Sequence, residues 1–203
     1  MKSVDTLKEM FQKFPGIGPR QSARFVHFLL NQNTIYRKTI ARAILDLENE
    51  VDRCQECKRF FYKESNKNLC SICASSSRDS EMLMIVLTDT DISQIEKTSS
   101  FNGRYYVLGA LTPISNTKTK TSVDFLIDSL KSKKSIPKEI ICAMPATPDG
   151  DNTVITIKQK IKENFPNEKL KISILGRGLS TGSEIEYADP DTLKNALKNR
   201  AEF

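Results

Sequence analysis

Cys54-Gln55-Glu56-Cys57 and Cys70-Ser71-Ile72-Cys73 are two Cys-x2-Cys turns separated by twelve residues. Each turn can direct two thiolates at one ion, and two such turns complete a tetrahedral four-cysteine site of the zinc-ribbon type. Four thiolates leave no position for a water molecule, so the pattern predicts one structural Zn²⁺ per chain. Four buried or redox-active thiols are the alternative interpretation. The fifth cysteine, Cys142, lies in an apolar run and is expected to be a core residue.

The overall composition is that of a globular protein with a basic N-terminal part. The 203 residues carry a net charge of +6, and 38% of them are hydrophobic. Residues 1–80 hold 14 basic and 9 acidic side chains, an excess of 5. A basic field favours a polyanionic partner such as DNA, although solvated surface lysines would produce the same total. No apolar stretch has the length of a signal peptide or a membrane span, and paired cysteines suit a reducing compartment, so we expect a cytoplasmic protein.

A glycine hairpin lies between two predicted amphipathic helices near the N-terminus. Apolar residues recur at helical spacing from Ser3 to Phe14, and again after Pro19. Gly16 and Gly18 allow the backbone to approach a phosphate, while Arg20 and Arg24 lie one turn apart at the start of the next helix. This pattern is typical of a helix-hairpin-helix that binds DNA phosphates without reading bases. The alternative is a tight turn with two solvated arginines. Three more basic side chains could extend the basic track that Arg20 and Arg24 begin: Lys38, Arg42 and Lys58.

Later in the chain the pattern changes to alternating strands and helices. Apolar runs at residues 82–87, 139–144 and 170–175 predict buried strands, and residues 105–108 predict another. Helical stretches are expected at 93–98, 123–133, 153–164 and 191–201, after a third N-terminal helix whose apolar stripe ends at Val51. This order predicts an α/β domain with a mainly parallel sheet.

Carboxylates follow two of the predicted strands. Asp89 and Asp91 come after the first strand, and Asp149 and Asp151 come after a later one. Because ligands bind α/β sheets at the carboxyl ends of strands, these side chains could hold Mg²⁺. Turn formation and helix capping also favour aspartate at such places. The sequence contains no phosphate-binding or dinucleotide-binding glycine motif and no visible nucleophile with its base.

Further motifs accompany the hairpin and the cysteines to the end of the chain: Asp91-x4-Glu96, Gly103 to Gly109, Leu111-Thr112-Pro113, Gly176-Arg177-Gly178, Gly182, Glu186 to Asp189, Thr192 to Leu197 and Arg200. With these motifs the whole chain resembles the RecR family of bacterial recombination mediators. The resemblance implies a Toprim fold for the α/β domain and a ring or clamp around DNA. It also implies that the protein acts with RecO, and sometimes RecF, to load RecA onto gapped DNA.

The expected fold class is therefore α+β multidomain. We expect a helix-hairpin-helix domain at 1–53, a four-cysteine zinc finger at 54–78, a Toprim domain at 79–175 and an oligomerisation segment at 176–203. A dimer or tetramer is expected, because a hairpin domain of about 50 residues is marginally stable alone.

Some residues depart from the family pattern. Leu87 stands where a Toprim enzyme has Glu, and Tyr106 stands where His is expected. Since leucine cannot ligate a metal, we expect a protein that is not an enzyme. A Mg²⁺-dependent Toprim enzyme that nicks, joins or primes nucleic acid is the alternative. In the non-catalytic interpretation the acidic edge binds a basic partner such as RecO through Asp89, Asp91, Glu96, Asp149 and Asp151.

Overall fold

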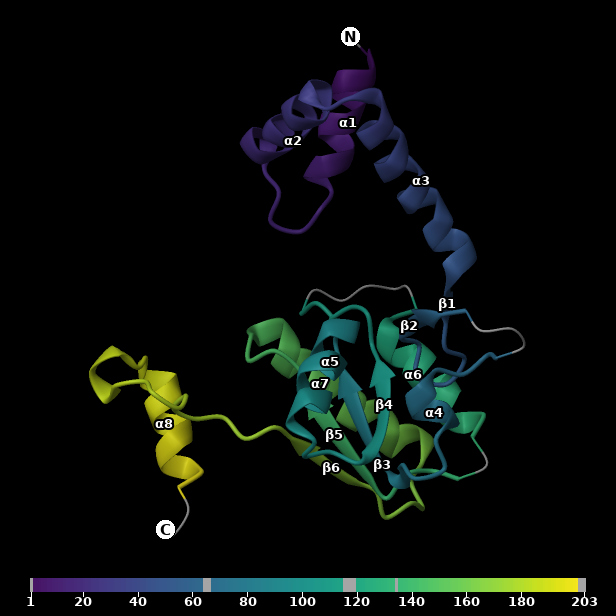
Figure 1. The fold of residues 1–203 in the computed structure, drawn as a ribbon. Coiled ribbons are helices and arrows are strands. Elements are labelled where there is room, and N and C mark those ends of the chain that lie inside the picture. The colour runs from purple at the N-terminus through teal and green to yellow at the C-terminus, as the bar shows by residue number, and fades with distance from the viewer. Residues whose placement is uncertain (1, 64–66, 115–119, 134, 201–203) are drawn as a thin grey trace. The chain divides into compact units, whose positions relative to one another are not determined.

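The computed structural model describes residues 2–63, 67–114, 120–133 and 135–200 (Figure 1). The chain forms two compact units, Met1–Asp52 and Arg53–Phe203. The first unit is helical, and the second contains a four-stranded parallel sheet. The predicted α+β class with a mainly parallel sheet is confirmed.

The first unit consists of α1 (Lys2–Gln12), α2 (Pro19–Asn31) and α3 (Thr34–Glu50). Proline at the first position of α2 suits a helix start, because its missing N–H would have no partner there. Asn33 caps α3 by accepting the N–H of Tyr36 at 2.8 Å. Val26 is buried between α1 and α2, and the rings of Phe11 and Phe25 meet edge to face at 5.7 Å. These contacts set the geometry of the loop that joins α1 to α2.

The cysteine segment is a small finger made of β1 (Val51–Arg53), β2 (Phe60–Tyr62) and the single turn α4 (Ser71–Ala74). β1 pairs with β2. The expectation that Val51 continues the helical stripe is wrong, because the chain becomes extended there to pair with β2 and to enter the first cysteine turn. The backbone carbonyl of Cys57 accepts the N–H of Val107 at 2.8 Å, which attaches the finger to the sheet.

The sheet contains β3 (Asp79–Val86), β4 (Gly103–Val107), β5 (Glu139–Ala143) and β6 (Lys171–Ile174) in the order β4-β3-β5-β6. All three pairings are parallel, so each connection must cross over the sheet. The connections contain α5 (Asp89–Thr98), α6 (Ser122–Lys131) and α7 (Pro148–Asn164). The apolar runs at 82–87, 105–108, 139–144 and 170–175 thus correspond to the four strands.

Alternate residues of β3 enter two different hydrophobic clusters. Leu83 and Ile85 pack in a cluster with residues of α6 and α7. Met84 and Val86 pack in a second cluster with Ile92 of α5 and the four cysteines. Since successive side chains of a strand point to opposite faces, the sheet is covered on both sides. The finger is one of the covering layers.

The crossover helices α5 and α7 begin four and five residues earlier, respectively, than their apolar patterns indicate. Threonines provide the caps: the Thr88 hydroxyl takes part in a capping box with Asp91, and Thr147 accepts the N–H of Gly150 at 3.2 Å. Polar first turns carry no hydrophobic period, so the sequence pattern begins only at the second turn.

The C-terminal segment contains the short helix η1 (Ile185–Tyr187) and α8 (Pro190–Lys198). Asp189 caps α8 by accepting the N–H of Thr192 at 2.9 Å. The expected end of this helix at Ala201 lies outside the described residues. Within 176–200 no side chain is buried, and Ile185, Tyr187 and Leu197 are exposed.

We predict that the link between α6 and α7 weakens at acid pH. Asp124 accepts the N–H and hydroxyl of Thr121 and pairs with Lys160. The Lys160 contact, followed by the Thr121 N–H, lowers the pKa of Asp124 from 3.8 to about 2. A lowered carboxyl pKa stabilises the fold above the unfolded pKa of about 4, and this contribution is lost as the pH falls through 2.

Replacing Lys160 by Gln should therefore lower the free energy of unfolding at pH 6 by about 1 kcal/mol, since partial exposure screens the pair. The difference should disappear near pH 2. Urea denaturation across a pH series measures it, with Lys158→Gln on the exposed face of the same helix as the control. An effect independent of pH would contradict the assignment.

Candidate metal centre and nucleic-acid interface

The four cysteines of the finger converge on one point. Their sulfur atoms all lie within 4.8 Å of one another, and all four residues are buried. The Cys57 and Cys70 sulfurs are 3.6 Å apart. Metal–sulfur bonds of about 2.3 Å at tetrahedral angles place sulfurs roughly 3.8 Å apart. The cluster therefore has the dimensions of a four-thiolate metal centre.

The electrostatics of the cluster suit a cation. Hydrogen bonds from the other thiols, that from Cys57 first, hold the pKa of Cys54 far below its ordinary value. The pKa of Cys73 is raised far above its ordinary value by hydrogen bonds with the other thiols, that with Cys54 first, and by burial. Four thiolates cannot coexist at this spacing without a positive charge, since each would repel the others. A divalent ion would allow all four to ionise.

The backbone of the finger holds the sulfurs in place. The N–H of Cys54 donates to the carbonyl of Arg59 at 2.9 Å, and the backbone N–H of Lys58 donates to the carbonyl of Cys54 at 3.0 Å. Lys58 has a left-handed backbone with φ of 64°, which closes the first turn. The N–H of Cys70 points at the Cys54 sulfur at 3.4 Å. By contrast, Cys142 lies in the other cluster, where burial raises the pKa of its thiol to about 12. The prediction that it is a core residue is confirmed.

The glycine hairpin between α1 and α2 leaves its backbone open. Gly16 has a φ of +76°, a conformation that favours glycine. A methyl group added at Gly16 or Gly18 would meet no atom within 4 Å. Gly18 is the N-cap of α2 and offers no side chain to the first N–H groups of the helix. Arg20 and Arg24 are exposed, and neither forms an ion pair with another residue that the structure describes. The hairpin thus combines bare backbone N–H groups with two available cations.

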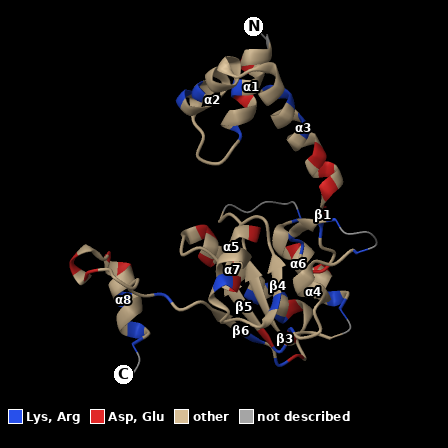
Figure 2. Ribbon diagram, in the orientation of Figure 1, with Lys and Arg blue, Asp and Glu red and all other residues tan. Residues whose placement is uncertain are grey.

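The basic track does not extend along the whole of α3. Lys38 and Arg42 line a shallow hollow on this helix, and Arg42 pairs with Asp46 at 2.9 Å. Figure 2 shows acidic residues in the last turns of α3. Lys58 belongs to the second unit, where it lines a different hollow. Within the first unit, Arg20 and Arg24 lie one turn apart at the start of α2.

The carboxylates expected at the sheet edge lie at two helix starts. Asp89 and Asp91 begin α5, and Asp149 and Asp151 begin α7. These helices follow β3 and β5, which are neighbours in the sheet. Most of the carboxylates have internal partners: Asp89 accepts the N–H of Phe60 at 2.8 Å, Asp91 that of Thr88 at 2.7 Å, and Asp151 pairs with Arg177. The Arg177 pair lowers the pKa of Asp151. Asp149 is exposed.

Glu96 lies on α5 inside a separate network. It pairs with Arg78 and accepts the hydroxyl of buried Tyr105 at 2.6 Å. Arg78 also donates to the carbonyl of Phe101 at 3.2 Å. The Arg78 contact is the main cause that lowers the pKa of Glu96. The network ties α5 to β4 and to the start of β3, and the Asp91-x4-Glu96 spacing alone did not indicate it.

The acidic edge does not form a compact carboxylate cluster. Across the described ranges, the four cysteines are the one group of three or more metal-type ligands whose atoms lie within 4.8 Å of one another. Leu87 is half-buried, and its backbone carbonyl accepts the N–H of Gly109 at 3.0 Å. Tyr106, where His was expected, is buried in the sheet.

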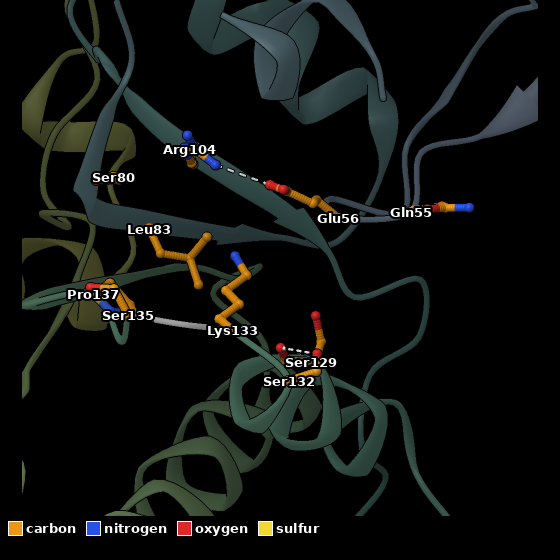
Figure 3. Close-up of a pocket in the computed structure, with 10 residues that line it drawn as sticks. All are labelled: Gln55, Glu56, Ser80, Leu83, Arg104, Ser129, Ser132, Lys133, Ser135 and Pro137. Carbon is orange, nitrogen blue, oxygen red and sulfur yellow. Dashed lines mark hydrogen bonds and ion pairs between the residues drawn. The ribbon is translucent and has the colours of Figure 1, made fainter. Parts of the chain in front are cut away.

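A further hollow of about 420 Å³ lies between the finger and α6 (Figure 3). The ion pair between Arg104 and Glu56, at 3.0 Å, forms one side, and Lys133 extends into the space. Ser132 turns its hydroxyl to the carbonyl of Ser129 at 2.9 Å.

Together these features define a multidomain protein that joins a helical hairpin, suited to phosphate, to an α/β sheet with a built-in four-cysteine finger. A family model described as "RecR, C-terminal" matches residues 178–201. Proteins named "Recombination protein RecR" match almost the whole chain. The relative from Phytoplasma mali (strain AT) is 32% identical over 202 residues, covering 99% of this chain and 95% of its own.

The relative from Amoebophilus asiaticus (strain 5a2) is 35% identical over 201 residues, covering 98% and 96% of the two chains. The relative from Bacteroides thetaiotaomicron is 34% identical over 195 residues, covering 95% and 90%. The chain belongs to the RecR family. Among the helices of the described residues, we find none with the length and apolar character to cross a membrane.

Proposed function

We propose that this chain is a recombination and repair protein that binds DNA without sequence preference and acts as a clamp. In this role it works with RecO, and sometimes RecF, to load RecA on gapped single-stranded DNA at the nucleoid. The observation that carries the proposal is the open hairpin of Gly16 and Gly18 next to Arg20 and Arg24, which form no ion pair within the described part of the chain.

The hairpin is suited to phosphate rather than to bases. The first N–H groups of α2 are not capped by a side chain, and the helix dipole adds partial positive charge there. Arg20 and Arg24 are spaced by one turn, so both can reach neighbouring phosphates. Contacts of this kind carry no sequence information.

Reversing both charges, Arg20→Glu with Arg24→Glu, should abolish binding to duplex DNA and weaken binding to gapped DNA, without unfolding the protein. Each lost phosphate contact should lower the log–log salt slope by about 0.9. Fluorescence anisotropy across a salt series measures both effects, with circular dichroism as the folding control. A second variant, Gly18→Ala, tests the backbone of the hairpin. The φ of −88° at Gly18 tolerates alanine, and the added methyl group would touch no protein atom but would occupy the proposed phosphate position. Unchanged affinity in both variants would assign the DNA surface elsewhere.

We propose that the metal is zinc and that it is structural. Four thiolates suit Zn²⁺, and the cysteines pack in the same hydrophobic cluster as Met84 and Val86 of β3. Metal binding in such a site is coupled to folding, because the unfolded chain has no preformed ligand set.

Elemental analysis should find one zinc per chain, and Cys70→Ser should lose the zinc and lower the melting temperature. Cys142→Ala is the matched control, since it removes a buried thiol outside the cluster and should retain the metal. A zinc-free Cys70→Ser protein as stable as the parent would show that the ion is not structural.

The acidic edge is proposed to be a docking surface for a basic region of RecO. Asp89, Asp91, Asp149 and Asp151 lie at two adjacent helix starts, whereas Glu96 is engaged inside the domain and is left out of the proposed surface. Asp149 is the best place for a test, because it is exposed and its replacement breaks no described contact. Opposite charges across an interface increase the association rate and the specificity.

Asp149→Lys should weaken RecO binding about tenfold, with a smaller effect at high salt. Titration calorimetry measures the affinity, and Glu168→Lys, at an exposed position after α7, is the control. The same preparations should leave plasmid DNA intact in Mg²⁺. Cleavage that requires Mg²⁺ and disappears in Asp149→Ala would instead support a Toprim enzyme.

A homo-oligomer, dimer or tetramer, is proposed because both ends of the chain expose apolar side chains. No residue of α3 is buried, and Ile35, Ile44, Leu45 and Leu47 are 77%, 62%, 65% and 57% exposed. Such surface is typical of association between copies.

Light scattering at micromolar concentration should give at least twice the chain mass. Ile44→Asp with Leu47→Asp should lower that mass, whereas Ile155→Asp, at an exposed position on α7, should not. A monomeric parent protein, with and without DNA, would refute the proposal.

A further inference from the structure

A second hollow of the Arg53–Phe203 unit has no role in the function proposed above. It measures about 450 Å³ and lies where β4 ends. Arg53 of β1 and Lys58 of the finger line one part of it, and Phe125 of α6 and the backbone at Gly109 line another. Three segments far apart in the sequence thus meet around one space.

The charge of this hollow is positive. Arg53 and Lys58 line it, and no carboxylate is among its described lining residues. Hydrogen bonds hold both cations in position: Arg53 Nε donates to the carbonyl of Lys58 at 3.0 Å, and Lys58 Nζ donates to that of Gln55 at 2.5 Å. A Cβ atom added at Gly109 would lie 4.0 Å from the Arg53 guanidinium, so the backbone at Gly109 borders the hollow beside this cation.

Aromatic rings accompany the cations. Phe125 is 56% exposed, although a phenylalanine gains free energy by burial. Lys120 lies over its ring at 5.1 Å and is paired with Asp128 at 2.6 Å. The Arg53 guanidinium lies over the ring of Phe60, which is 55% exposed, at 5.3 Å.

We infer that this hollow binds an unpaired nucleotide of single-stranded DNA. The phosphate would lie beside Lys58 and Arg53, and the base would stack on Phe125. Single-stranded nucleic acids are bound by this combination of a positive groove and exposed aromatic rings. A duplex keeps its bases stacked inside, so only an unpaired base can use the ring.

The choice of DNA as the ligand rests on the proposed function. The site is separate from the hairpin, which contacts phosphates alone. A gap in duplex DNA offers both substrates, double-stranded phosphates for the hairpin and unpaired bases for this hollow.

The test uses the full chain carrying Arg20→Glu and Arg24→Glu, so that the hairpin does not contribute. A labelled oligo-dT of about 15 nucleotides is compared by anisotropy with an abasic strand of the same length. This protein should bind oligo-dT more tightly than the abasic strand. Phe125→Ala should weaken oligo-dT binding about tenfold, and Phe125→Tyr should restore it.

Lys58→Asn should also weaken binding and lower the salt slope by about 0.7, the value for a single-strand phosphate. Asparagine tolerates the left-handed backbone of position 58, so this variant removes the charge without straining the turn. Ile155→Ala and Lys158→Ala, exposed on α7, are the matched controls and should change nothing.

Equal affinity for oligo-dT and the abasic strand would overturn the inference, as would unchanged binding in Phe125→Ala. Displacement of oligo-dT by an acidic peptide of equal charge would also overturn it, because charge alone would then explain binding. If the reversed arginines leave duplex binding intact, the hairpin proposal fails. The dependence of oligo-dT binding on Phe125, measured in the parent protein, still decides this inference.

Discussion

The hydrogen bond from the N–H of Val107 to the carbonyl of Cys57, together with the burial of the cysteines, supports the architecture of the second unit. β4 is an edge strand, and an open edge exposes unpaired backbone groups. The finger pairs with that edge at Val107 and packs with α5 on one face of the sheet. If its four sulfurs are buried as thiolates, their charges must be balanced, so a cation at this point would stabilise the cysteine turns and the sheet they cover.

Because the finger is attached at β4, it also determines the chemistry at the carboxyl ends of the strands. The end of β4 carries the cationic hollow with Arg53 and Lys58, whereas β3 and β5 lead into the acidic starts of α5 and α7. Asp89 accepts the N–H of Phe60 and so connects the acidic side to the finger. One edge of the sheet thus presents opposite charges side by side, suited to different partners.

Much of the fold follows from local patterns in the chain. Continuous apolar runs predicted the strands, because strands buried on both faces need apolar residues at every position. The hairpin was predicted from Gly16 and Gly18, and the metal centre from the spacing of the cysteines. The starts of α5 and α7 were missed because their first turns are polar and capped by Thr88 and Thr147. Val51 was misassigned because its strand partner lies beyond the first cysteine turn.

By itself, the sequence determined most of the elements, the four cysteines of the cluster and the two arginines at the start of α2, since these depend on residues close together along the chain. Only the tertiary structure decided which charged groups are available to a partner. Glu96 became an internal anchor for Arg78 and Tyr105, Asp151 was paired with Arg177, and Asp149 remained exposed. It also brought Arg53 and Lys58 beside Phe125. These outcomes arise from contacts between distant segments, which parallel crossovers create and which no local spacing encodes.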